Sequence, residues 1–482
     1  MTEVRSSSTG GRARAPTELA IRRLSRYDLH CLAVETPARP IHIGILAVLD
    51  GTSLLDPAGH LPLADIRREL DGRVAGVPEL RRVVFHPGHL AGRPLWVDDH
   101  DFEIARHVTE AQLSPPGDDE ALLELAERLL APPLDRSRPL WRIWFVTGLA
   151  GGRVGVLVAL HHALADGQTA MRMVRALLEP PMGLAGPGSR QPAPEPPPPW
   201  GALVRDSIEG TASSALWLAR PATWRLVAGV VRSFRLVSAL AREAPVTSLN
   251  APVGPRRRLA TLRLDRADVK RVARAHGCGV NDVVLGLVTG GVRALLGARG
   301  EPVALLRPRV GIAVALFGTS HAGEAGNGIG TLHVPLPVPE PDPGARLSIV
   351  AAERAQAKGS PLVAVEPVLR AWFGRIGAVR RSMEHQRLVN LAETYLPGPP
   401  VAIDILGARV LDLLPIAPLA GNLGLSFVTL SYAGRLAVTV RADADQFPDL
   451  DLLTAAMERD WRALAGSVAP GPICGAPART GT

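Results

Sequence analysis

The chain has 482 residues, of which 46% are hydrophobic, and it carries a formal net charge of +8. This composition excludes a largely disordered chain, and the length allows two domains with buried cores. All but two of the 54 basic residues are arginines, and they are spread along the chain without a basic run that alternates with aromatic residues, so we expect no nucleic-acid partner.

The distribution of proline and glycine suggests how the chain is divided. A stretch that includes four consecutive prolines at residues 196–199 cannot continue a helix or a central strand. We predict, in chain order, a disordered tail (1–17), an N-terminal domain (18–178), a proline-rich linker (179–200), a helical crossover segment (201–245), a C-terminal domain (246–466) and a flexible tail (467–482).

Metal binding and membrane insertion are not expected. The three cysteines are isolated from one another, and His86 and His89 lie in a turn without obvious further ligands. Charged residues interrupt every apolar run before it reaches the length needed to span a bilayer. A basic amphipathic helix over residues 224–242 could lie on a lipid surface or pack as an ordinary scaffold helix with its arginines in water. We therefore expect a cytoplasmic protein, with peripheral contact to membranes or lipid droplets left open.

The most informative stretch lies around residue 160. Residues 153–160 are mostly apolar and rich in valine, which predicts a largely buried strand that ends at His161 and His162. Successive strand side chains point to opposite faces, so one imidazole can face a cavity while the other faces the layer behind. Asp166 and Gly167 then turn the chain into a helix, because apolar residues recur at helical spacing: Ala170, Met171, Val174, Leu177 and Leu178.

The pattern HHxxxDG points to acyl transfer. An imidazole can take the proton of an attacking hydroxyl or amine and return it to a leaving thiolate. No G-x-S-x-G elbow supplies a covalent nucleophile, since residues 318–322 come closest and lack the second glycine. Direct transfer in a ternary complex is therefore the simpler mechanism. The alternative is that the two histidines are structural residues at a strand end.

Further segments occur in a fixed order: residues 24–28 (LSRYD), 34–37 (VETP), 41–44 (IHIG), 96–102 (WVDDHDF), 133–141 (PLDRSRPLW), 280–284 (VNDVV), 326–330 (GNGIG), 332–337 (LHVPLP) and 430–436 (LSYAGRL). Together with HHxxxDG they resemble the bacterial wax ester synthase/diacylglycerol acyltransferase family, within the superfamily of chloramphenicol acetyltransferases and condensation domains. Two segments depart from the family pattern. Residues 393–399 (ETYLPGP) stand where the family carries Ser-Asn-Val-Pro-Gly-Pro, and residues 307–312 match only loosely.

The resemblance implies an α/β (α+β) fold, with two chloramphenicol-acetyltransferase-like domains around a central active-site channel. It implies an acyl-CoA-dependent O-acyltransferase that forms triacylglycerol from diacylglycerol or wax esters from long-chain alcohols. Acyl-CoA would be a co-substrate, and no cofactor or metal is implied.

The resemblance also assigns roles to residues of the motif. His162 would be the general base and His161 mainly structural. Asp166, with Gly167, would organise the motif, for example through Arg138 or Arg142.

Candidates for substrate binding or oxyanion stabilisation lie in two other matching segments: Pro139, Leu140, Trp141, Asn281 and Asp282. Asn281 follows a glycine-rich turn, so capping of a helix would equally explain it. Two alternative functions stay open. One is a specialised acyltransferase with a secondary-metabolite, sugar or peptide acceptor, and the other is a non-catalytic lipid-binding surface protein.

Overall fold

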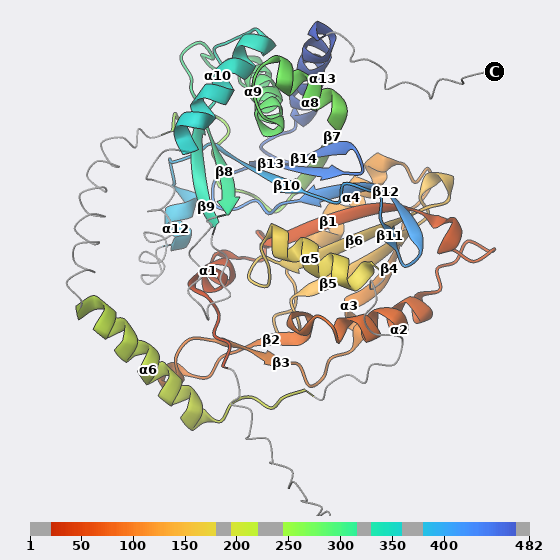
Figure 1. Cartoon of the computed structure of the whole chain (residues 1–482), viewed down its shortest axis with the longest axis vertical. Coiled ribbons are helices and arrows are strands. Elements are labelled where there is room, and N and C mark those ends of the chain that lie inside the picture. The colour runs from red at the N-terminus through yellow and green to blue at the C-terminus, as the bar shows by residue number, and fades with distance from the viewer. Residues whose placement is uncertain (1–20, 180–193, 220–243, 316–328, 359–378, 469–482) are drawn as a thin grey trace, which may run out of the picture.

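In the described part of the chain, two six-stranded sheets covered by helices form the body of the protein (Figure 1). The computed structural model describes residues 21–179, 194–219, 244–315, 329–358 and 379–468. The mixed α/β class predicted from the sequence is confirmed. The predicted amphipathic helix (224–242), the glycine-containing segment 318–322 and most of the two predicted tails lie outside the described residues.

The first sheet combines strands from both ends of the chain. Its order is β11 (Asp404–Ile405), β12 (Ala408–Ile416), β1 (His42–Asp50), β6 (Arg153–His161), β5 (Trp141–Thr147) and β4 (Val108–Gln112). β12 pairs antiparallel with β1, with Leu46 opposite Leu414. The division predicted from the sequence assigns residues 404–416 to the C-terminal domain, whereas the structure pairs them with the first sheet.

The second sheet contains only strands from the C-terminal half. Its order is β7 (Arg257–Asp265), β14 (Arg435–Asp443), β13 (Leu425–Tyr432), β10 (Leu391–Pro397), β8 (Arg309–Ala315) and β9 (Ile329–Pro335). β10 runs parallel to both of its neighbours. A separate hairpin is formed by β2 (Arg82–Phe85) and β3 (Leu95–Asp98).

The helices lie on the sheet faces according to their apolar residues. α2 (Leu63–Val74), α3 (Ile104–His107) and α5 (Gly167–Leu178) pack on one face of the first sheet, and α4 (Asp119–Leu130) packs on the other. α8 (Arg266–Ala275), α9 (Val280–Ala298), α10 (Pro343–Lys358) and α13 (Leu450–Ser467) cover the second sheet. The remaining described helices are α1 (Arg26–Val34), α6 (Trp200–Ala219), which packs beside the β2–β3 hairpin, and α12 (Val379–Glu384).

α9 is the central helix of the second core. Among the described residues, it is the one helix that is long and apolar enough to cross a membrane, and 78% of its most apolar window is buried inside the protein. As predicted, charged residues interrupt the apolar run of α9, at Asp282 and Arg293, although the mean hydropathy of the helix stays high. Packing against the second sheet accounts for the apolar composition of α9.

A buried ion pair joins the two halves of the protein. Glu127 on α4 receives two hydrogen bonds from the guanidinium of Arg441 on β14, at 2.8 and 2.7 Å. The two side chains are 6% and 3% exposed, and α4 packs between the first sheet and strands β7 and β14. Two parallel N–H to carboxylate bonds define both distance and orientation, so this pair fixes how the sheets meet.

Candidate active site

The two adjacent histidines lie where a central strand of the first sheet ends. The backbone N–H of His161 donates to the carbonyl of Leu140, and that of His162 donates to the carbonyl of Ile41, each at 2.9 Å. The strand predicted over residues 153–160 is confirmed as β6. The backbone of both histidines is therefore held by the residues that precede β1 and β5, the strands on either side of β6.

His162 is half-buried beside a tyrosine hydroxyl. The hydroxyl oxygen of Tyr27 lies 3.3 Å from Nε2 and 3.4 Å from Nδ1 of His162, and the two rings meet edge to face with centroids 5.4 Å apart. Burial lowers the pKa of His162 below the ordinary value for histidine, with the charge of Asp166 as one opposing influence. The imidazole is therefore neutral at neutral pH and can accept a proton.

His161 faces the interior. Its side chain is fully buried, and it continues the face of β6 that carries Leu157 and Ala159, which pack against α4. Its Nδ1 accepts a hydrogen bond from the backbone N–H of Ala163 at 3.0 Å, so the ring proton sits on Nε2. That Nε2 lies 3.3 Å from Oε1 of Glu35. Nδ1 is therefore hydrogen-bonded within the protein, and Nε2 faces the Glu35 carboxylate.

Glu35 is a site residue that the sequence did not single out. Its carboxylate is 3% exposed, and it accepts hydrogen bonds from the backbone N–H of Ile41 at 3.1 Å and from the guanidinium of Arg136 at 2.9 Å. Burial alone would raise the pKa of Glu35, but the interactions with His161, Arg136 and Ile41 outweigh it and lower the pKa to about 2. A permanently charged carboxylate therefore stands behind His161.

Asp166 caps the helix that follows the histidines. Its carboxylate accepts a hydrogen bond from the backbone N–H of Thr169 at 2.7 Å, at the start of α5. The helix predicted after Asp166 is confirmed. The expected arginine contacts are wrong, because Arg138 pairs with Asp135 at 3.3 Å and the Arg142 guanidinium lies over a tryptophan ring at 4.9 Å. Helix capping instead explains how Asp166 organises the motif.

Gly167 brings the second sheet close to the histidines. A Cβ atom at this position would lie only 3.0 Å from Cδ2 of Leu396, which belongs to β10. Leu396 also packs against the apolar core that contains α5. The first turn of α5 and strand β10 are therefore in contact because residue 167 has no side chain.

The Pro-Leu-Trp segment supports the site from behind. Pro139, Leu140 and Trp141 are all buried, and the indole N–H of Trp141 donates to the carbonyl of Leu80 at 2.7 Å. The carbonyl of Leu140 accepts from the backbone N–H of His161. These contacts use the polar groups that a substrate would need, so the position of the segment favours a supporting role over the predicted substrate contact.

The Asn-Asp pair lies at the start of α9. The N-cap is Gly279, and the Asp282 carboxylate closes the capping box by accepting from its backbone N–H at 2.7 Å. Asp282 also pairs with Arg354 at 2.8 Å. The expectation that Asn281 itself caps the helix is therefore wrong, because Asn281 lies inside the first turn.

The Asn281 side chain is bonded to a buried carboxyl group. Its Nδ2 donates to Oε2 of Glu393 on β10 at 3.4 Å, and the two residues are 8% and 1% exposed. Burial raises the pKa of Glu393 to about 7, against the opposing effects of Asn281 and Arg354. The amide proposed from the sequence as an oxyanion donor is thus directed at Glu393.

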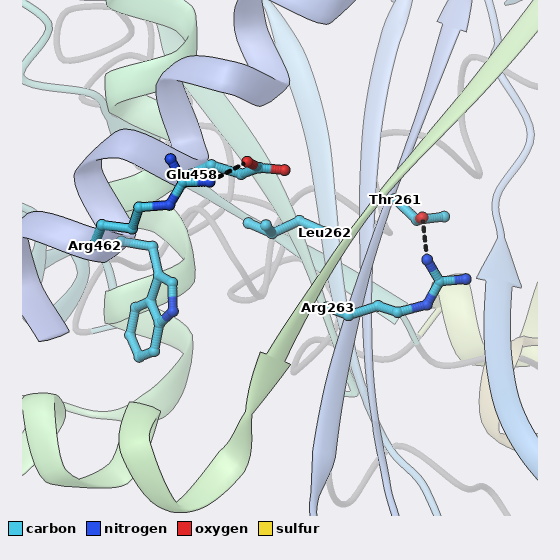
Figure 2. A pocket seen from close by; sticks show the side chains of 6 residues that line it. Thr261, Leu262, Arg263, Glu458 and Arg462 are labelled. Atoms are coloured by element: carbon cyan, nitrogen blue, oxygen red, sulfur yellow. Dashed lines mark hydrogen bonds and ion pairs between the residues drawn. The ribbon is translucent and has the colours of Figure 1, made fainter.

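A surface pocket lies between β7 and α13, away from the histidine motif. It is lined by Thr261, Leu262, Arg263, Glu458, Trp461 and Arg462. Figure 2 shows that Arg462 pairs with Glu458, at 3.0 Å, and that Arg263 donates to Thr261, at 3.2 Å. Its charged groups already have partners, and no residue of HHxxxDG lines it, so we do not assign it a role in acyl transfer.

Comparison with known proteins places the chain in a family. The wax ester synthase/diacylglycerol acyltransferase (WS/DGAT) catalytic domain model matches residues 24–284, and the WS/DGAT C-terminal domain model matches residues 325–465. The chain belongs to the WS/DGAT family. The resemblance and the acyltransferase class predicted from the sequence are confirmed.

Mycobacterial members of the WS/DGAT family match over most of the chain. A putative diacylglycerol O-acyltransferase of Mycobacterium tuberculosis is 31% identical over 461 residues, which cover 90% of this chain and 88% of that protein. The probable diacylglycerol O-acyltransferase tgs1 of the same organism is 32% identical over 457 residues, which cover 90% of this chain and 94% of that protein.

Solved structures share the fold. The WS/DGAT of Marinobacter aquaeolei VT8 superposes with a TM-score of 0.67 at 19% identity and covers 92% of this chain and 100% of that chain. The first condensation domain of the calcium-dependent antibiotic synthetase, in complex with a substrate analogue, gives a TM-score of 0.57 at 19% identity and covers 93% and 97%. The predicted relation to the condensation-domain superfamily is therefore confirmed at the level of the fold.

Two further residues of this WS/DGAT site were missed from the sequence. Tyr27 and Glu35 lie in segments that carry the family resemblance, but no local pattern assigns either of them a contact with a histidine that follows more than 120 residues later. In the sequence pattern, Tyr27 at the start of α1 and Glu35 at its end look like ordinary surface residues. Only the packing of α1 against residues 41 and 163 brings them to the site.

Proposed function

We propose that this WS/DGAT-family chain transfers an acyl group from acyl-CoA to the hydroxyl of diacylglycerol or of a long-chain alcohol, with His162 as the general base. The observation that carries the proposal is the contact at His162. Burial lowers the pKa of this half-buried imidazole, and its Nε2 lies 3.3 Å from the hydroxyl oxygen of Tyr27, which supports the proposal that the nitrogen can interact with a hydroxyl group. An acceptor hydroxyl needs the same approach to lose its proton.

The proposed reaction proceeds in two steps. His162 takes the proton of the acceptor hydroxyl as its oxygen attacks the thioester carbonyl, and the carbonyl π electrons move onto the carbonyl oxygen. The tetrahedral intermediate then collapses, the carbon–sulfur bond breaks, and the electron pair leaves with the sulfur. The imidazolium returns its proton to the thiolate, which yields free CoA and an ester. No protein residue forms a covalent bond.

The neighbouring residues support this assignment through His162. His161 is fully buried and hydrogen-bonded through Nδ1, so it is proposed as a positioning residue and not as the base. The charge of Glu35 orients the His161 ring. Asp166 holds the start of α5, and its negative charge favours the imidazolium that forms at His162 during the reaction.

The acceptor class is the part of the proposal that has a rival. Strand β10 contacts the first turn of α5 through Leu396 and contains most of the segment 393–399, in which Pro-Gly-Pro is kept but the family's preceding polar pair is not. Because this altered segment adjoins the site, a specialised acceptor such as a sugar, a peptide or a secondary metabolite is the second candidate. The non-catalytic lipid-binding alternative is set aside, because the chain belongs to a family of acyltransferases.

The test is release of free CoA from palmitoyl-CoA by the purified protein, with dipalmitoylglycerol, with hexadecanol and without an acceptor. The matched variant is His162→Ala, and His161→Ala is compared per folded molecule. We expect acceptor-dependent release that His162→Ala reduces by about 10²- to 10⁴-fold. Near-parental turnover by folded His162→Ala would refute the base assignment, and no release with either lipid would favour the specialised acceptor.

The cellular location forms the last part of the proposal. We infer a cytoplasmic protein with peripheral contact to membranes or lipid droplets, where its lipid substrates lie. The net charge of +8 supports attraction to anionic headgroups. Sedimentation with vesicles of phosphatidylglycerol, compared with vesicles of phosphatidylcholine, tests this: equal recovery in the supernatant of both would contradict it.

A further inference from the structure

The carboxylate of Glu35, which follows α1, has different partners for its two oxygens. Oε2 accepts hydrogen bonds from Nη2 and Nε of Arg136, at 2.9 and 3.3 Å. Oε1 accepts from the backbone N–H of Ile41 at 3.1 Å and lies 3.3 Å from Nε2 of His161. Because the side chain is 3% exposed, these contacts lie out of water and are electrostatically strong.

The peptide groups on either side of Ile41 tie this carboxylate to the backbone of the base. The N–H of Ile41 donates to Glu35, and its carbonyl accepts from the backbone N–H of His162 at 2.9 Å. The Ile41 side chain is buried beside Ala163, in the cluster that also contains Cys31 of α1. Glu35 is therefore held at a fixed place relative to residue 162.

The position of the ring proton matters in His161, because its two nitrogens have opposite tasks. Nδ1 accepts from the backbone N–H of Ala163 at 3.0 Å, so Nδ1 carries no proton. The proton then sits on Nε2, which has no aligned hydrogen-bond partner among the described residues and faces the charge of Glu35. That negative charge favours the Nε2–H tautomer. With the proton on Nδ1, two N–H groups would point at each other and Ala163 would have to move.

His42 does not take the place of His161 as a donor to Glu35. Its Nε2 lies 3.7 Å from the same Oε1 but accepts a hydrogen bond from the backbone N–H of Leu134 at 3.3 Å. Burial lowers the pKa of His42 to about 4, so its ring is neutral and this nitrogen has no proton to share. The charge at Oε1 is therefore directed at Ile41 and His161.

We propose that Glu35 is a positioning residue for the general base: it keeps the proton of His161 on Nε2, so that Nδ1 can hold Ala163 and thereby set where His162 lies. This inference rests on the proposed function, in which His162 takes the proton of the acceptor. Residue 162 lies between the two residues that the hydrogen bond joins, so a shift of Ala163 moves the His162 imidazole. Glu35 acts on the reaction only through His161.

Glu35→Gln removes the charge with little change in shape. A carboxylate offers an oxygen on both of its sides, whereas an amide offers one oxygen and one NH₂ group. When the amide oxygen stays with Arg136, the NH₂ group faces His161 and favours a proton on Nδ1. With palmitoyl-CoA and dipalmitoylglycerol or hexadecanol, we expect kcat per folded molecule to fall by about 10- to 100-fold with little change in KM.

Asp460→Asn is the matched control for loss of an arginine-paired carboxylate. Asp460 on α13 pairs with the buried Arg346 on α10, and both helices cover the second sheet on its side away from the first sheet (Figure 1). This variant should lower the melting temperature and keep kcat per folded molecule. A fall in kcat as large as that of Glu35→Gln, or no fall in Glu35→Gln, would overturn the proposal.

Substitutions of His161 test the route from Glu35 to the base. Asparagine places its oxygen where Nδ1 lies and keeps an acceptor for Ala163, whereas glutamine places its amide where Nε2 lies. We therefore expect His161→Asn to retain more kcat than His161→Gln. Because asparagine has no ring proton, adding Glu35→Gln to His161→Asn should cost a clearly smaller factor than it costs the parent. An equal factor in both backgrounds, or the reverse order of the two variants, would overturn the proposal.

A measurement on the unsubstituted protein covers the case in which Glu35→Gln does not fold. With ¹⁵N in the histidine rings, protonated and unprotonated nitrogens have well separated chemical shifts, and the His161 signals are those lost in His161→Asn. We expect the Nε2–H form at neutral pH, and an imidazolium or the Nδ1–H form would overturn the proposal. Activity that survives in His162→Ala refutes the proposed function, whereas parental kcat in Glu35→Gln beside an inactive His162→Ala refutes only this inference.

Discussion

The buried carboxyl group of Glu393 makes stability depend on pH in a direction opposite to that of most acidic residues. Glu393 is 1% exposed, its Oε2 has the long bond to Asn281, and its Oε1 has no hydrogen-bond partner among the described residues. Burial raises the pKa of Glu393 from 4.5 to about 7. At one pKa unit per about 1.4 kcal/mol, the cost of ionising this group in the folded protein is roughly 3 kcal/mol.

The sign follows from comparing folded and unfolded chains. Below pH 4.5 both the folded and the unfolded chain hold the proton on Glu393, so ionisation of Glu393 does not reduce the free energy of unfolding there. Between pH 4.5 and about 7 the unfolded chain releases the proton while the folded chain keeps it, so the free energy of unfolding falls as pH rises. Above about pH 7 the loss of roughly 3 kcal/mol is complete and constant.

Glu393→Gln removes the titration and keeps the shape of the side chain. We expect the variant to match the parent at pH 4.5 and to exceed it at pH 8 by up to roughly 3 kcal/mol, measured by urea unfolding followed by tryptophan fluorescence. Glu124→Gln is the matched control, because Glu124 is 67% exposed and loses the same charge without burial. A difference between Glu393→Gln and parent that is the same at both pH values would refute the reasoning.

Two further substitutions test the histidine site. Glu35→Gln should lower the free energy of unfolding at pH 7 by up to roughly 3 kcal/mol, because a carboxylate whose pKa is held near 2 stabilises the fold above pH 4.5. In urea titrations, the difference between variant and parent should shrink as the pH falls toward 2. A difference that stays constant with pH would contradict this prediction. Gly167→Ala places a Cβ 3.0 Å from Leu396 and should lower the free energy of unfolding by about 1 kcal/mol, detected as a fall in the thermal midpoint. Adding Leu396→Val to Gly167→Ala should recover part of that loss, and no recovery would show that the contact is not the cause.

The local parts of the site followed from the sequence. The strand before the histidines, the helix after Asp166 and the order of the motifs depend on neighbours within a few residues, through alternation, helical spacing and capping. Those signals were enough to predict a mixed α/β acyltransferase and to select His161 and His162. The resemblance supplied the family, because it rests on the order of several short motifs.

The tertiary structure decided which distant groups meet. Tyr27 lies 135 positions before His162, and Asn281 lies 112 positions before Glu393, so no local pattern relates either pair. The same holds for residues 404–416, which complete the first sheet from the far end of the chain. A charged side chain such as Glu35 has the same sequence signature whether it faces solvent or a histidine. Its chemistry is set by burial and by partners, and these arise only when the elements pack.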